Sequence, residues 1–90
     1  MKKTLKTLRR EIDQIDQELI KLLAKRFKVT QKIGIYKKEY NLPPQDKKRE
    51  KQLFKERKQW AEKEGLNIKL IEKIFKLIIE KVRQDHKKLQ

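Results

Sequence analysis

The strongest constraint on the fold is a repeat of apolar residues that runs through the first 40 positions of the chain. These residues recur at alternating steps of three and four, in this order: Leu5, Leu8, Ile12, Ile15, Leu19, Leu22, Val29, Ile33, Tyr36 and Tyr40. A sustained heptad repeat predicts one long α-helix. We expect Thr4 to cap its start and Gly34 to be its one weak position. Pro43 and Pro44 are expected to end it.

The length of this helix has a consequence for assembly. A helix over residues 5–40 would be ~54 Å long at about 1.5 Å per residue. A compact domain of this size has a radius of gyration of only ~12 Å. Because one chain cannot easily cover so long an apolar stripe, we expect a partner chain to cover it.

Two shorter helices are predicted after the prolines. The second begins near Gln45 and Asp46, where an acid suits the helix dipole, and ends at Gly65, a residue typical of left-handed caps. Asn67 is expected to cap the third helix, whose apolar stripe reads Ile68, Ile71, Phe75, Ile78 and Val82. No strand is predicted. The fold class is therefore all-α, with three helices per chain (one long, two shorter), in an intertwined six-helix homodimer whose single domain covers residues 1–90.

Composition excludes several classes of protein. The chain has no cysteine and one histidine, so a disulfide framework, a thiolate metal site and a histidine cluster are excluded. The basic N-terminus lacks the continuous apolar stretch of a signal peptide. No run approaches the ~18 apolar residues of a membrane span. We expect a soluble, cytoplasmic protein.

The net charge of +14 raises the possibility of a nucleic-acid partner. Basic residues are mixed with acids along the whole chain, which favours a solvated surface over a polyanion site. There are 21 lysines but 6 arginines, so each arginine stands out as a candidate for binding carboxylates, which suit its planar fork.

Several charged or polar residues interrupt the apolar faces. Arg26 occupies a heptad position and Lys37 returns to nearly the same face, while His86 follows Val82 by one turn. Each has a simpler interpretation, such as a register-setting Arg26 or a His86 exposed at a fraying end. The second helix adds a charged first turn, which by itself fits an exposed cap with local ion pairs: Asp46, Arg49 and Glu50. Because unpaired buried charge is costly, their convergence from three helices predicts a polar pocket.

At this point the chain resembles the all-helical class of chorismate mutases over nearly its whole length. The resemblance rests on "LRREIDQIDQELIKLLAKR", "KIGIYKKEYNLPPQDKKRE" and "LIEKIFKLIIEKVRQ". It implies a dimeric enzyme without metal or cofactor that rearranges the dianion chorismate to prephenate in aromatic amino-acid biosynthesis. Matched residue by residue, it places the substrate-binding site on Arg9, Arg26, Lys37, Asp46, Arg49 and Glu50. Two further site positions fall on Val82 and His86. The family usually has a small polar residue in place of Val82 and a glutamine in place of His86.

The resemblance also implies a role for each residue. Arg26, with Arg9 donated by the other chain, would hold the carboxylates. Lys37 and His86 would face the ether oxygen, with Gln84 or Gln90 as the alternatives to His86. The charged first turn of the second helix would serve the substrate hydroxyl: Glu50 would accept it with the help of the Asp46 backbone, and Arg49 would fix Glu50.

Two rival functions are considered. The first is isochorismate pyruvate-lyase, which has the same fold and a stretch similar to "WAEKEGL", although Glu50 argues against it because that family lacks this acid. The second is a non-catalytic basic helical dimer that binds nucleic acid or regulates a partner enzyme. Such a dimer would bind with steep salt dependence and show no turnover.

Overall fold

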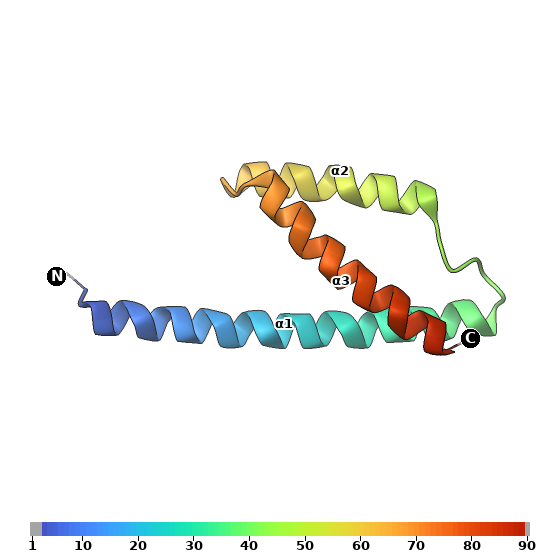
Figure 1. Ribbon diagram of the computed structural model, residues 1–90, viewed down its shortest axis with the longest axis horizontal. Coiled ribbons are helices and arrows are strands. Elements are labelled where there is room, and N and C mark those ends of the chain that lie inside the picture. The colour runs from blue at the N-terminus through green and yellow to red at the C-terminus, as the bar shows by residue number, and fades with distance from the viewer. Residues whose placement is uncertain (1–2, 90) are drawn as a thin grey trace. The chain divides into compact units, whose positions relative to one another are not determined.

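The computed structural model describes residues 3–89, which form three α-helices and no strand. Helix α1 spans Leu5–Glu39, α2 spans Lys47–Lys63 and α3 spans Ile68–Leu89 (Figure 1). The predicted all-α class, with one long and two shorter helices, is confirmed. The described chain divides into two compact units, residues 3–30 and residues 31–89, and each is described by itself.

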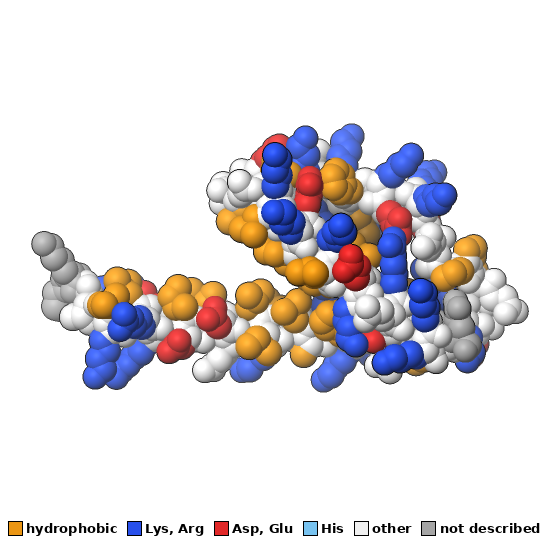
Figure 2. Space-filling view, in the orientation of Figure 1, with side chains coloured by type: hydrophobic (Ala, Val, Ile, Leu, Met, Phe, Trp, Pro, Cys, Tyr) orange, Lys and Arg blue, Asp and Glu red, His pale blue; other side chains and the backbone are white. Residues whose placement is uncertain are grey.

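The N-terminal unit is the first part of α1, and its start is capped as predicted. The Thr7 amide donates a hydrogen bond to Thr4 Oγ1 at 3.2 Å, and the Thr7 hydroxyl donates to the Thr4 carbonyl at 2.8 Å. The side chains of the heptad stripe stay open to solvent in this unit; Ile12 and Ile15 are each 56% exposed. Figure 2 shows these apolar side chains along the helix.

The C-terminal end of α1 lies within one residue of the predicted position 40, but the residues that end the helix differ from the prediction. Asn41 adopts a left-handed conformation with φ 54°, and its amide donates to the Lys38 carbonyl at 3.3 Å. The Leu42 amide donates to the Lys37 carbonyl at 2.8 Å. These two bonds form a Schellman motif. The helix therefore ends at Glu39, with Asn41 as the left-handed residue that closes it, and the two prolines follow a helix that has already ended.

The caps of α2 and α3 follow the prediction. Asp46 is the N-cap of α2, and its carboxylate accepts the Arg49 amide at 3.0 Å. Gly65, with φ 69°, ends α2 in a second Schellman motif, in which the Leu66 amide donates to the Ala61 carbonyl at 2.8 Å. Asn67 Oδ1 accepts the Leu70 amide at 3.0 Å at the start of α3.

Helices α2 and α3 pack against each other within the C-terminal unit (Figure 1). Ala61 lies at their contact and is only 4% exposed. Beside it runs an apolar groove of about 380 Å³, where the Arg57 guanidinium lies 4.3 Å from the centre of the Phe75 ring. The groove is lined mainly by apolar side chains, among them Phe54, Ile68, Ile71, Phe75 and Ile79. Among residues 3–89, none of the helices is long and apolar enough to cross a membrane.

Candidate active site

A pocket of about 300 Å³ with a mixed polar and apolar lining lies where the last turns of α1 and α3 meet the connection to α2. Lys37 comes from α1 and His86 from α3, so two residues predicted to act together line one pocket. The remaining lining residues are Gly34, Lys38, Asn41, Leu42, Pro44 and Leu89. Two of the lining side chains are lysines and none is a carboxylate, so the pocket suits an anionic group.

Lys37 is half-buried, and the connection after α1 holds its ammonium group. Lys37 Nζ donates a hydrogen bond to the Pro44 carbonyl at 3.2 Å. Because Asn41 and Leu42 close the end of α1, the chain turns back and brings this carbonyl over the helix. The two prolines therefore belong to the segment that orients Lys37.

His86 is half-buried in the last turns of α3 and lies against Gly34 of α1. Val82, one turn earlier on α3, is also half-buried. Of the two alternatives to His86, Gln84 is exposed, while Gln90 lies outside the described residues.

The charged first turn of α2 is held by hydrogen bonds between Asp46 and the backbone amides that follow it. The Asp46 carbonyl accepts the Glu50 amide at 3.0 Å, and its side chain caps the helix. Glu50 Oε1 accepts a hydrogen bond from an Arg83 guanidinium nitrogen on α3 at 3.3 Å. The predicted role of Arg49 in fixing Glu50 stays a prediction.

Arg83 is a residue that the sequence interpretation missed. It lies on α3 beside Val82, and its pairing with Glu50 crosses 33 positions. A helical period relates only residues of one helix, so it carries no signal for such a contact. The sequence did offer one sign that Arg83 pairs with a carboxylate: arginine is scarce in a chain with 21 lysines.

Arg9 and Arg26 belong to the N-terminal unit. Arg9 is exposed and Arg26 is half-buried. They lie about 25 Å apart along α1 at about 1.5 Å per residue. Arg9 therefore cannot reach the surroundings of Arg26 on its own chain, and the convergence of both arginines with Lys37 stays a prediction.

The described residues do not form the ligand sets that bind metal ions. Among residues 3–89, no three or more His, Cys, Asp and Glu side chains are grouped so that they could hold a metal ion. The means available in the pocket are cations and hydrogen-bond donors, which act on negative charge.

Comparison with known proteins links this geometry to a family. The model of the family described as chorismate mutase type II matches residues 8–87. The T-protein of Haemophilus influenzae is 40% identical over 72 residues, which cover 80% of this chain and 19% of the relative. The bifunctional chorismate mutase/prephenate dehydratase of Buchnera aphidicola subsp. Schizaphis graminum is 39% identical over 88 residues, 98% of this chain and 23% of the relative.

A shorter relative is similar over most of its own length. The chorismate mutase of Methanocaldococcus jannaschii is 28% identical over 73 residues, which cover 81% of this chain and 74% of the relative. The first two relatives are much longer, and this chain spans about a fifth of each. The similarity to them therefore concerns one segment of those proteins.

Proposed function

The chain belongs to the type II chorismate mutase family, and from this premise we propose that it converts chorismate to prephenate. The observation that carries the proposal is the pocket of about 300 Å³ that Lys37 and His86 line together. Its cationic lining suits a dianionic substrate. One relative's name pairs the mutase with prephenate dehydratase, which supports prephenate as the product.

The proposed reaction is an intramolecular rearrangement in which one C–O bond breaks and one C–C bond forms. Every atom of the substrate stays in the product, so no nucleophile or redox partner is required. The enzyme has to hold an extended dianion in a compact, chair-like conformation and stabilise the negative charge that grows on the ether oxygen. Positioning and electrostatic stabilisation are therefore its means of catalysis.

Lys37 and His86 are proposed to donate to the ether oxygen. Lys37 brings a full positive charge, and the Pro44 carbonyl at 3.2 Å restrains the ammonium before substrate arrives. Such pre-orientation lowers the cost of arranging the donor at the moment of reaction. His86 lines the same pocket from α3, which supports a second donor to the same oxygen.

The other proposed contacts bind the two ends of the substrate. Arg26 holds one carboxylate and Arg9, from the other chain, holds the second through a bidentate pair. Glu50 accepts the substrate hydroxyl, with the first turn of α2 around it. Arg83 restrains Glu50 across α2 and α3, while Arg49 stays near the ring end and Val82 contributes an apolar wall.

We further propose that two copies form an intertwined homodimer. Two observations support it: the heptad stripe of α1 is open to solvent, and the apolar groove between α2 and α3 has no described segment seated on it. Arg9 also lies too far along α1 to serve the surroundings of Arg26 on its own chain. A second copy covers the apolar surfaces and supplies Arg9 to the site.

Turnover of chorismate tests the proposed function directly. Loss of chorismate absorbance on adding the protein, with prephenate identified as the product, is the expected result. Lys37→Ala is the matched control because it removes the proposed donor, and it should be slow at equal protein concentration. No conversion by the wild-type dimer would refute the proposal.

The same assay separates the rival functions. A lyase would release pyruvate from isochorismate, and this activity should be absent. A nucleic-acid-binding dimer would leave chorismate unchanged and would bind duplexes with an affinity that falls steeply with salt.

A further inference from the structure

We propose that Gly34 is a positioning residue: the absence of a side chain there sets the place of the His86 imidazole beside Lys37. The placement is a matter of geometry within residues 31–89. Its effect on rate rests on the proposed function, because only there does His86 act on a reacting atom.

Gly34 is the buried residue of α1 and lies directly under the end of α3. An ideal Cβ built on it would lie 2.7 Å from His86 Cδ2 and 2.9 Å from His86 Nε2. It would also lie 2.9 Å from Leu89 Cδ1. Carbon atoms in favourable contact are about 3.5–4.0 Å apart, so a methyl group fits there only if the His86 and Leu89 side chains move.

The backbone gives no other reason for glycine at this position. Gly34 lies inside a continuous helix, and the positive-φ glycine of the described chain is Gly65. Alanine forms helix better than glycine, so glycine at position 34 weakens α1. What glycine provides is the close approach of His86.

The atoms that a methyl group would meet belong to side chains of α3, not to backbone. Gly34→Ala should therefore preserve α1 and push the imidazole aside. Gly34, Lys37 and His86 line the same pocket, so this displacement changes where the imidazole can donate. Misplacement of a catalytic group by about 1 Å can cost on the order of 100-fold in rate.

The first experiment observes the imidazole itself. His86 is the one histidine of the chain, so its ring resonances need no further assignment. The wild-type protein should show a nuclear Overhauser cross-peak between the Gly34 α-protons and the imidazole. In Gly34→Ala the ring shifts should move while circular dichroism stays helical, whereas Lys32→Ala, an exposed substitution on the same stretch of α1, should leave them in place.

The second experiment is a double-substitution cycle on turnover. Gly34→Ala should lower kcat by roughly 10- to 100-fold with a much smaller change in KM, because the lost interaction forms mainly in the transition state. In a His86→Ala background the same substitution should cost little, because no imidazole is left to displace. An equal loss of kcat in both backgrounds would overturn the proposal.

The two experiments separate this proposal from the proposed function. The cross-peak needs neither turnover nor a variant, so it decides the placement even if chorismate is not a substrate or Gly34→Ala fails to fold. Its absence in the wild-type protein would overturn the proposal and leave the mutase assignment standing.

Discussion

Replacing Ile15 by alanine should weaken the proposed dimer without disturbing the helix. Ile15 lies on the heptad stripe of α1 and is 56% exposed in the single chain. Alanine is the better helix former, so a loss of assembly cannot be assigned to a weaker α1. The substitution therefore reports on the contact between chains.

The magnitude follows from the area that remains to be covered. Full burial of an isoleucine side chain contributes about 1.5–3 kcal/mol, and Ile15 still has about half of its surface to bury. Alanine should therefore cost roughly 1–1.5 kcal/mol in each chain, and two-fold symmetry doubles this to about 2–3 kcal/mol per dimer. Since 1.4 kcal/mol is tenfold in an equilibrium constant, the dimer should dissociate at concentrations on the order of 30- to 100-fold higher.

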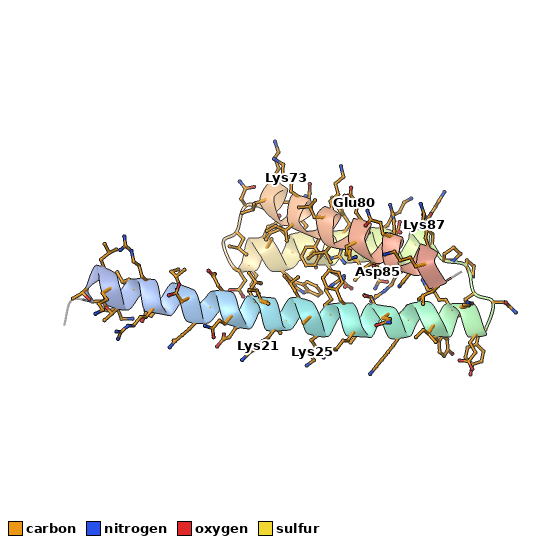
Figure 3. All side chains as sticks on the ribbon, turned by 60° about the horizontal axis from the view of Figure 1, so that its bottom comes forward. Lys21, Lys25, Lys73, Glu80, Asp85 and Lys87 are labelled. Carbon is orange, nitrogen blue, oxygen red and sulfur yellow. The ribbon has the colours of Figure 1, made fainter. Side chains whose placement is uncertain are left out.

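Sedimentation velocity over a dilution series measures this shift, with circular dichroism recorded at each concentration. Lys21→Ala is the control, because Lys21 is a charged residue of the same helix that lies off the heptad stripe. Its side chain projects from the same side of α1 as that of Lys25 (Figure 3). The wild type and Lys21→Ala should dissociate at similar concentrations. The reasoning fails if Ile15→Ala leaves the dissociation midpoint unchanged, or if Lys21→Ala shifts it equally.

Three substitutions in the candidate site should show which charged side chains act on the substrate and which only stabilise the fold. Lys37→Ala should lower kcat by roughly 100- to 1,000-fold, as measured by chorismate turnover, because it removes a cation from the growing negative charge; near-wild-type kcat would place the donor elsewhere. Glu50→Ala should lower kcat/KM while helical content by circular dichroism stays unchanged, and unaltered activity would mean that this turn does not contact substrate. Arg83→Gln should raise KM more than it lowers kcat and leave the melting temperature nearly unchanged, because an exposed ion pair contributes only about 0–1 kcal/mol to stability; a large drop in melting temperature would show that Arg83 is structural.

Local signals in the sequence predicted much of the fold. Thr4, Asn67 and Gly65 were each expected at a helix end, and each makes the expected cap. Their side chains or backbone freedom act within a few residues, so position in the sequence is sufficient to identify them. The end of α1 was predicted near residue 40 but attributed to the prolines, whereas Asn41 closes the helix. Asparagine is a weaker signal for a left-handed cap than glycine.

Contacts between helices were harder to predict. Gly34 was interpreted as a weak position of a long helix, and its meaning depends on α3 passing over it. The pairing of Arg83 with Glu50 likewise depends on the packing of α2 against α3. Heptad spacing places a residue on a face of its own helix but does not identify the residue opposite. Polar residues on the apolar faces of three helices predicted a pocket, but only the resemblance to a known family assigned Lys37 and His86 to the same atom of a substrate.

The most direct test of the account is whether each active site is built from two chains. Arg9→Ala and Arg26→Ala chains should each be nearly inactive as homodimers. After equal mixing and subunit exchange, half of the dimers are mixed and each mixed dimer has one site with both arginines, so activity should recover to about a quarter of wild type. If the mixture stays at the mean of its two inactive parents although mixed dimers have formed, the two arginines do not meet across the dimer and the shared site is wrong.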